Sequence, residues 1–361
     1  MNTAWLNLFH HRVGGDEHSA FRDSARGLID TLVTPALSDW RAGTSTPAQA
    51  LAGLGESGLL GTAAPEEFGG GGVPDVRFVV ALVEELAAAG ATALAHVVAV
   101  HSGIVIPLLT EHGGADHRQQ WLPPLAAGTA LAAVVAAGAV SGADEDGMMT
   151  ATSVPGGGCA ELFAVVRDDT IDLISARADG TTVSAVSNAL GGLDCPQADL
   201  RIKAGGDRAT IEAAGLSARM QTDADFWFAV VSLAASRRSL ALAAAYTAER
   251  QVFGQRLADF ENTRHRLAEI GAQLDVAQVY LDRALELRER GQLTPGISAV
   301  LRMTAALTHD RCADQSLQLH GGYGYMWEYP VSQAFSDAQY LRQQERMWSD
   351  PRDTIADQLA V

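Results

Sequence analysis

The sequence is poor in basic side chains. It contains 26 lysine and arginine residues against 43 aspartate and glutamate residues, for a formal net charge of −17, and Lys203 is its single lysine. Binding to a nucleic acid depends largely on clustered lysine and arginine side chains that neutralise phosphates, and no such cluster occurs along the chain. The composition therefore predicts no nucleic-acid partner and no attraction to an anionic membrane surface.

Cysteine is also scarce. The three cysteines, Cys159, Cys195 and Cys312, lie far apart in the sequence, which fits neither a disulfide framework nor a set of zinc ligands. The histidines are scattered as well, so we predict no metal site. Residues 1–12 lack a charged start followed by an apolar run, so no secretory signal is expected and the predicted location is the cytoplasm.

Aromatic side chains are few, at 6% of the chain, whereas hydrophobic residues make up 47% and charged residues 19%. This balance excludes a disordered chain and favours closely packed helices with small side chains. Residues 86–110 carry no Asp, Glu, Lys or Arg and are long enough to span a bilayer. They include His96, His101, Ser102 and Pro107, however. We therefore interpret them as a helix buried inside the protein.

The apolar pattern changes twice along the chain. Residues 17–127 have helical spacing with short breaks. From about residue 128 to 216, short apolar runs such as residues 162–166 alternate with Gly and Asp, which predicts strands and turns. Helical spacing returns from about residue 223 and continues to the end.

This pattern predicts an α+β fold that is mainly α. We expect an N-terminal helical domain (1–127), a small central β domain (128–218) and a C-terminal helical bundle (219–361). In the first domain, Asp75 is expected to cap the helix that follows it. In the third, an alanine-rich helix is expected to end near Gly254.

Two segments carry the most specific pattern. Residues 318–331 read QLHGGYGYMWEYPV, and glycines after a helix let a ligand approach backbone amides that can bind a phosphate or a carbonyl. Residues 249–255 read ERQVFGQ, and an arginine at a helix end can hold a phosphate with two parallel hydrogen bonds. Taken alone, the first segment is better explained as a helix C-cap and turn, and the second as a surface arginine.

Together the two segments resemble the acyl-CoA dehydrogenase family of flavoproteins. Its members carry R-x-x-F-G and, well downstream, Q-x-x-G-G-x-G-(Y/F)-x-x-E-(Y/F)-P, which residues 250–254 and 318–330 match. Residues 54–61 (LGESGLLG), 65–70 (PEEFGG) and 112–114 (HGG) are similar to the signature of the family's first domain. The resemblance covers nearly the whole chain.

The resemblance implies an N-terminal helical domain, a central β domain and a C-terminal four-helix bundle, with FAD as the cofactor. Two subunits build each flavin site in the family, so a homo- or hetero-oligomer, dimer or tetramer, is expected. The positions that touch the FAD held mainly by the neighbouring subunit are Arg250, Phe253, Gln318, Gly321 and Gly322. The implied substrate is an acyl-CoA or an acyl-carrier protein.

The family's reaction needs a base for the α-proton of an acyl thioester, while hydride leaves the β-carbon for the flavin. The base is usually a glutamate eight residues after the aspartate of an R-D-A segment. Ser336, Asp337 and Ala338 occupy that segment here, and Glu345 lies eight residues after Asp337. The resemblance implies that Glu345 is the catalytic base, with a pKa raised by burial. The alternative is a surface glutamate that pairs with Arg342 on the same helix face.

The sequence departs from the family where a chain contacts its own flavin. Arg346 and Met347 replace the Gly-Thr pair after the base, and residues 138–145 replace the T-E-P-x-A-G-S-D loop. Ser153 and Pro155 stand at the positions of the flavin-stacking aromatic residue and the threonine, and a strand pair of the central domain is missing. The surface for a neighbouring subunit's flavin is kept, whereas the surface for the chain's own flavin is degraded. This asymmetry indicates a second, more typical acyl-CoA dehydrogenase-like subunit as partner.

Three functions are compatible with these residues. The first is FAD-dependent α,β-dehydrogenation of an acyl thioester with Glu345 as the base. The second is a non-catalytic or flavin-free partner subunit of a heteromeric acyl-CoA dehydrogenase, which the altered central loop favours and Glu345 disfavours. The third is a flavin monooxygenase or an unusual biosynthetic enzyme on the same fold. Glu345 argues against the monooxygenase, because such relatives typically lack the base carboxylate.

Overall fold

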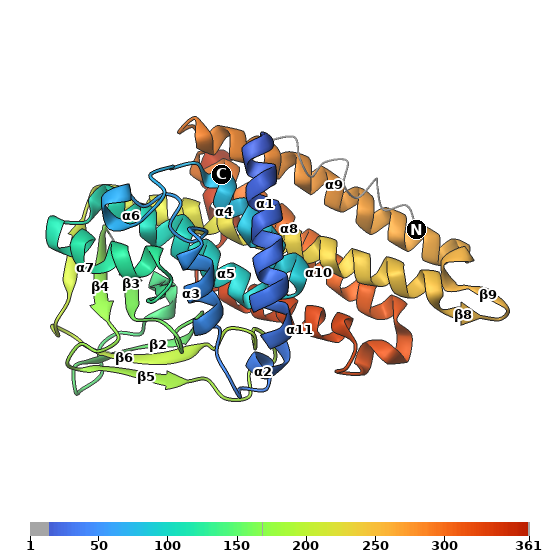
Figure 1. Cartoon of the computed structure of the whole chain (residues 1–361), viewed down its shortest axis with the longest axis horizontal. Coiled ribbons are helices and arrows are strands. Elements are labelled where there is room, and N and C mark those ends of the chain that lie inside the picture. Colours follow the sequence, from blue (N-terminus) through green and yellow to red (C-terminus); the bar gives the residue numbers. More distant parts are fainter. Residues whose placement is uncertain (1–13, 168, 360–361) are drawn as a thin grey trace.

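The computed structural model describes residues 14–167 and 169–359 of the chain. Helices come first, strands follow, and long helices complete the chain, as Figure 1 shows. The predicted fold class, mainly helical with a small sheet region, is confirmed. The predicted bounds of the three domains, 1–127, 128–218 and 219–361, stay a prediction.

The N-terminal helices begin and end at local signals. Asp75 precedes α4, and its Oδ1 accepts the backbone N–H of Arg77 at 2.9 Å, which confirms the predicted cap. Gly90 ends the same helix in the left-handed region. The helices of this part are α1 (Asp16–Leu32), α2 (Leu37–Arg41), α3 (Ala48–Glu56), α4 (Val76–Ala89), α5 (Thr92–Val100), α6 (Ile106–His112) and α7 (Ala115–Ala126).

A π-helical turn (His101–Val105) joins α5 and α6, so the helix is continuous over Thr92–His112. By length and composition this helix and Leu216–Glu249 are each apolar enough to cross a membrane. The apolar windows of the two helices are 89% and 67% buried inside the protein, as core helices are, which makes them weak evidence for a membrane span. Burial of the first helix matches the interpretation made from the sequence.

The strands form two small sheets. The first has the order β1-β3-β4-β7, in which β1 and β3 run parallel and the other pairs antiparallel, and the second has the antiparallel order β2-β6-β5. Their bounds are β1 (Ala132–Val135), β2 (Met148–Val154), β3 (Leu162–Val166), β4 (Thr170–Ser175), β5 (Thr181–Ala185), β6 (Ala198–Lys203) and β7 (Ala209–Glu212).

The first sheet is buried on both faces. Along β3, Leu162 and Ala164 join the main core with the helices, whereas Phe163 and Val165 join a second core against the other sheet. This division follows from the strand period of two, because successive side chains point to opposite faces. The sheet thereby lies between the helices and the second sheet, and its β1 edge reaches the site described below.

The C-terminal part is built on the long helix α8 (Leu216–Glu249). In Figure 1 it runs beside α9 (Glu261–Glu289) and α10 (Pro295–Leu319), both of which contact it. A hairpin of β8 (Gln251–Val252) and β9 (Gln255–Arg256) separates α8 from α9, and α11 (Pro330–Glu345) and α12 (Pro351–Leu359) follow α10. The predicted end of α8 near Gly254 is a few residues too far along, because the hairpin turn begins first.

A buried loop ties the central strands to both sets of helices. The Asp194 carboxylate accepts the backbone N–H of Leu94 at 2.9 Å in the first turn of α5. The carboxylate of Asp337 on α11 accepts the N–H of Gly192 at 2.9 Å. A Cβ at Gly191 would overlap the carbonyl oxygen of Ser336, so only glycine allows the loop to approach α11 this closely.

We predict that Gly191→Ala lowers the free energy of unfolding by about 1–3 kcal/mol, because the new methyl group meets backbone that cannot move aside without shifting α11. Gly27→Ala is the matched control, since a Cβ there, on the exposed side of α1, meets nothing within 4 Å. Helix propensity should make this control up to about 1 kcal/mol more stable. Denaturant unfolding of both variants measures the difference, and a Gly191→Ala protein as stable as wild type would contradict the assigned contact.

Candidate functional site

One surface pocket gathers four of the five residues predicted to contact flavin. It has a volume of about 480 Å³ and lies where the end of α8, the β8–β9 hairpin and the end of α10 meet. Arg250, Gln318, Gly321 and Gly322 all line it. We call it the Arg250 pocket; its other lining residues are Tyr246, Val252, Leu257, Leu319, His320, Tyr323 and Met326.

Chain turns after α8 and α10 shape the Arg250 pocket. Arg250 leaves α8 in an extended conformation, and the hairpin that follows turns at Phe253 (φ 50°) and Gly254 (φ 81°). Positive φ at both central residues is what a two-residue hairpin with a type I′ turn requires. After α10, Gly321 also has positive φ, at 56°. The positive φ at Gly321 lets the chain turn after α10 ends at Leu319 and continue along the pocket.

The Arg250 pocket is suited to an anion beside an aromatic group. The Arg250 guanidinium lies 5.4 Å from the centre of the Tyr323 ring, and among the described residues it forms no ion pair. A Cβ at Gly321 or Gly322 would meet no atom within 4 Å, so the backbone is open to a ligand. Arginine and freely accessible amides are the groups that bind phosphate oxygens. Tyr246, stacked on His320 at 4.2 Å, adds an aromatic wall.

Phe253, the fifth predicted residue, does not line this pocket. Its side chain is 94% exposed at the tip of the hairpin. A large exposed aromatic side chain on a projecting turn has nothing to pack against within the described chain, so a contact between Phe253 and flavin stays a prediction.

The segments that depart from the family meet at a second place, between the first sheet and the helices α8 and α11. They line a cavity of only about 30 Å³, which we call the inner cavity. That is room for about one or two water molecules. Its lining includes Ala139, Ser153, Pro155, Gln344 and Met347, together with His96, Val97, Val100, residues 132–136, Thr152, Val154, Ala224, Trp227, Phe228 and Trp348.

Direct contacts close the inner cavity. A Cβ at Gly138 would lie 2.6 Å from the carbonyl oxygen of Met347, so the loop after β1 packs on the segment after α11. The Gln344 Nε2 donates to the Ser153 carbonyl at 3.0 Å and to the Gln197 side chain at 3.1 Å. The large side chain of Trp348 adds to the lining. A three-ring flavin does not fit this cavity with its side chains in these positions.

Sequence reasoning missed several residues of the inner cavity. His96 is buried, and its Nδ1 lies 3.0 Å from the hydroxyl of Tyr340 on α11. Burial lowers the pKa of His96 to about 4, so the ring is neutral at pH 7. Phe228 and Trp348 were missed as well. The aromatic run at residues 226–228 was the only signal for this region, and nothing local distinguishes it from ordinary core.

Glu345 is the last residue of α11 and is half-buried. Its removal from water raises the pKa of Glu345 to about 7, with Asp310 and Asp225 adding to the increase and Arg302 opposing it. Arg302 donates to the backbone carbonyl of Glu345 at 2.8 Å and to the carboxylate of Asp225 at 2.7 Å. Arg342 does not take the expected alternative role, because it pairs with Asp310.

The Glu345 carboxylate has no hydrogen bond or ion pair with any other part of the chain that the structure describes. Its neighbours Gln344 and Met347 line the inner cavity, whereas Glu345 itself does not. The structure therefore places Glu345 beside that cavity, and Glu345 is not among the residues of the Arg250 pocket. What the arrangement provides is an unpaired carboxyl group that gains or loses its proton near neutral pH.

The raised pKa predicts a pH dependence of stability. Because folding favours the protonated form of Glu345, its stabilising contribution is complete below the ordinary pKa of 4.5 and is lost as pH rises to about 7. Glu345→Gln stays neutral and avoids that loss. Relative to wild type, the free energy of unfolding of Glu345→Gln should therefore rise by about 1–2 kcal/mol between pH 4.5 and 7.5. The partial exposure of the side chain makes this smaller than full burial would. Denaturant unfolding at a series of pH values measures the change.

Glu145→Gln, at an exposed loop position, is the control and should follow the wild-type pH profile. If the free energy of unfolding of Glu345→Gln changed with pH in parallel with that of wild type, the conclusion that folding removes an unpaired Glu345 carboxyl group from water would be wrong.

Comparison with known proteins identifies the architecture. The family model for the acyl-CoA dehydrogenase N-terminal domain matches residues 15–129, and the model for the acyl-CoA dehydrogenase C-terminal domain matches residues 226–345. The inner cavity draws much of its lining from the stretch between these two ranges.

Whole-chain relatives agree. The mitochondrial long-chain specific acyl-CoA dehydrogenase of Mus musculus is 26% identical, over 91% of this chain and 83% of its own. The crystal structure of an acyl-CoA dehydrogenase from Geobacillus kaustophilus has a TM-score of 0.87 at 22% identity, over 97% of this chain and 100% of its own. A glutaryl-CoA dehydrogenase from Mycobacterium smegmatis, solved in complex with FADH2, has a TM-score of 0.81 at 19% identity, over 96% and 95%. The chain belongs to the acyl-CoA dehydrogenase family, whose members are FAD-dependent oxidoreductases that act on acyl-CoA.

Proposed function

We propose that this chain catalyses α,β-dehydrogenation of an acyl thioester, carried by coenzyme A or an acyl-carrier protein, with Glu345 as the acceptor of the α-proton. The observation that carries the proposal is the half-buried, unpaired Glu345 carboxyl group with a pKa raised to about 7. A general base works best when its pKa lies near the operating pH, because it is then both ionised in part and basic enough to take the proton.

The chain's own residues would hold and move that proton. Arg302, which donates to the Glu345 backbone carbonyl, fixes the end of α11 without pairing with the carboxylate. Partial burial limits the access of water to the carboxyl group, and an apolar acyl chain bound beside it would exclude water further. FAD supplies the hydride acceptor for the β-carbon in this chemistry.

The Arg250 pocket supports a flavin shared between two chains. Arg250 directly follows the last residue of α8, whereas Trp227, in the first half of the same helix, lines the inner cavity. The rise of an α-helix places these two residues about 35 Å apart, so the Arg250 pocket and the inner cavity lie far from each other along α8. We infer that the Arg250 pocket serves a flavin whose ring lies in a neighbouring subunit.

A second function is favoured by the closed inner cavity. If Met347 and Trp348 keep their positions, the flavin ring of this chain has no place, and the chain acts as a flavin-free partner of a more typical subunit. The first function instead requires the segment after Glu345 to move when flavin binds. The two functions therefore differ in one observable, which is flavin bound by this chain alone.

An absorption spectrum of the chain, purified alone and incubated with FAD, separates the two functions. Dehydrogenation by this chain predicts a retained flavin spectrum that bleaches with butyryl-, octanoyl- or palmitoyl-CoA. With Glu345→Gln, flavin should stay bound while bleaching slows by at least about a hundredfold. Glu212→Gln, at an exposed position on β7, should bleach as wild type does.

A colourless chain would overturn the first function and favour the partner subunit. A flavin-containing Glu345→Gln protein that bleaches normally would leave dehydrogenation standing and refute only the role of Glu345.

Arg250→Ala should weaken FAD binding to the assembled oligomer by on the order of tenfold or more, because it removes a cation that pairs with a phosphate. Arg266→Ala, at an exposed position on α9, is the matched control and should leave FAD affinity unchanged. FAD release monitored by flavin fluorescence gives the affinity. Equal FAD retention in the two variants would refute the assignment of Arg250.

A further inference from the structure

The segment that closes the inner cavity is short. Residues 346–349, which we call the linker segment, lie between Glu345 at the end of α11 and the start of α12. Met347 and Trp348, in the middle of the linker segment, line the inner cavity. Dehydrogenation by this chain requires these two side chains to move, so the contacts that hold the linker segment decide whether the cavity opens.

One buried arginine of α10 donates hydrogen bonds to both ends of the linker segment. Arg302 donates from Nη2 to the backbone carbonyl of Glu345 at 2.8 Å and from Nη1 to the backbone carbonyl of Ser349 at 3.0 Å. The guanidinium group holds its N–H donors in a fixed planar fork, so it fixes the spacing of the two carbonyls that it binds. A single side chain thereby sets where the linker segment begins and ends.

Two side chains of α8 complete these contacts. The Oδ1 of Asp225 accepts from Nη1 of Arg302 at 2.7 Å and from Nε2 of Gln221 at 2.7 Å. The Oε1 of Gln221 in turn accepts the backbone N–H of Ser349 at 3.1 Å. We call Gln221, Asp225 and Arg302 the clamp. The hydrogen bonds run from Ser349 through the three clamp residues and back to Ser349, and bonds linked in this way strengthen one another.

The closed position of the linker segment helps to satisfy the buried charges of the clamp. Burial raises the pKa of Asp225, while the charge of Arg302 and hydrogen bonds from Arg302 and Gln221 oppose that increase. A buried ion pair is stable only when hydrogen bonds satisfy the remaining donors and acceptors. Arg302 uses carbonyls of Glu345 and Ser349 for this purpose. The clamp and the closed linker segment therefore stabilise each other.

The two ends of the linker segment are held unequally. At the first end, the carbonyl of Glu345 accepts from buried Arg302 and also from the N–H of Trp348 at 3.2 Å. At the second end, Ser349 is exposed, and so is its hydrogen bond to Gln221. Water replaces an exposed hydrogen bond at little cost, whereas a buried donor left without an acceptor costs free energy. The Ser349 end is therefore the easier one to release.

We propose that the clamp positions the linker segment over the inner cavity, and that the segment opens from its Ser349 end while Arg302 keeps Glu345 in place. The clamp residues are positioning residues, because they act through Met347 and Trp348. Opening makes room for a planar ring without displacing the carboxyl group. The inference rests on the proposed function only in taking this ring to be that of flavin.

Hydrogen exchange of the chain without ligand tests the clamp. Gln221→Met keeps the size of the side chain and removes both hydrogen bonds of its amide. Exchange at the N–H groups of Met347 and Trp348 should become about fivefold faster, because the open form is more populated. These two groups bond to carbonyls next to them and not to Gln221, so a purely local effect would change Ser349 alone. Mass spectrometry with fragmentation to single residues measures the rates.

Gln278→Met is the matched control. Gln278 on α9 donates to Asp282 at 2.6 Å, four residues farther along the helix, as Gln221 donates to Asp225 on α8. The variant removes the same kind of contact outside the clamp. Exchange in the linker segment should stay at the wild-type rate.

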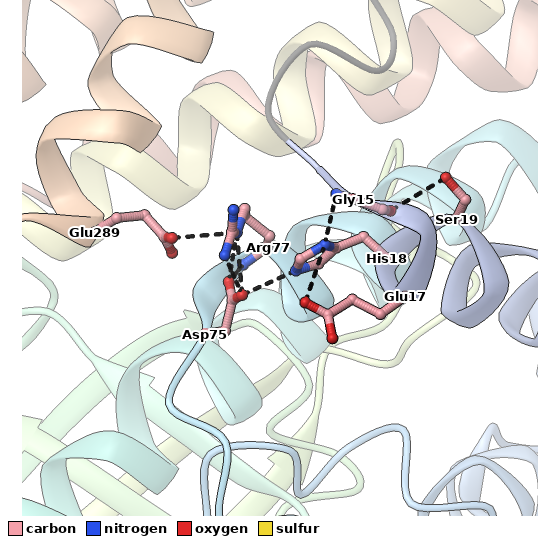
Figure 2. A network of polar contacts seen from close by, with 7 residues as sticks. All are labelled: Gly15, Glu17, His18, Ser19, Asp75, Arg77 and Glu289. Carbon is pink, nitrogen blue, oxygen red and sulfur yellow. Dashed lines mark hydrogen bonds and ion pairs between the residues drawn. The ribbon is translucent and has the colours of Figure 1, made fainter.

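Figure 2 shows the site of a second control. Arg77 lies between Asp75 and Glu289, with its Nε at 2.8 Å from Asp75 and 3.1 Å from Glu289, and the second contact joins α4 to the end of α9. Glu289→Gln weakens this link between the N-terminal helices and the bundle, outside the clamp. Wild-type exchange in the linker segment of this variant would separate the action of the clamp from a general loosening of the fold.

FAD affinity of the assembled oligomer is the second readout, and its expected sign is opposite to that of structural damage. Damage to the fold weakens FAD binding. Gln221→Met should instead bind FAD about fivefold more tightly, because apparent affinity rises with the population of the open form. The increase in affinity and the increase in exchange rate should therefore agree.

Unchanged exchange at Met347 and Trp348 in Gln221→Met, or equally fast exchange in the two controls, would overturn the inference. Weaker FAD binding by a variant with faster exchange would overturn it as well. If no variant binds FAD while exchange rises as expected, the clamp stands and dehydrogenation by this chain fails. Gln221→Ala removes the same hydrogen bonds and repeats the test if the methionine variant does not fold.

Discussion

The hydrogen bonds around the loop of Gly191, Gly192 and Asp194 hold the three parts of the chain in register. Asp194 accepts N–H groups in the first turn of α5, where the helix dipole favours a negative charge. Gly192 donates to Asp337 on α11. Since Glu345 lies about two turns farther along the same helix, the position of the proposed base depends on this loop. Two buried carboxylates, those of Asp194 and Asp337, therefore help to hold the interior together by accepting backbone N–H groups, in addition to hydrophobic packing.

Burying the carboxylates of Asp194 and Asp337 close together costs electrostatic free energy, which neighbouring arginines and backbone N–H groups reduce. Burial and the charge of Asp194 raise the pKa of Asp337 to about 7, while Arg41 and Arg238 oppose that increase. Burying carboxylates without partners would cost on the order of several kcal/mol, so the backbone N–H groups and the arginines are needed. The same loop brings Gln197 against Gln344, and that contact helps to close the inner cavity. Closure of the inner cavity is thus a consequence of how the domains are joined.

Local patterns in the sequence predicted what depends on local structure. Asp75 caps α4 because capping needs only its own neighbours. Arg250 and Gln318 line one pocket, and it was the family resemblance, not a local pattern, that grouped them. The extent of closure at Met347 was beyond prediction, since it depends on contacts with residues far away in the sequence, such as Gly138. The π-helical turn at His101–Val105 was equally invisible, because a π turn has no sequence signature.

The open Arg250 pocket and the closed inner cavity constrain any assembly that contains this chain. If flavin is shared as proposed, each Arg250 pocket in an oligomer of identical chains would receive a flavin whose ring lies in another copy of the same inner cavity. If that cavity stays at about 30 Å³, no copy holds a ring and every Arg250 pocket lacks a ligand. Under the proposed function, a homo-oligomer with flavin requires Met347 and Trp348 to move in every chain, whereas a mixed oligomer requires no movement here. Two free energies decide between these assemblies. One is the cost of displacing the two side chains from their packed positions, and the other is the free energy of binding a second kind of subunit.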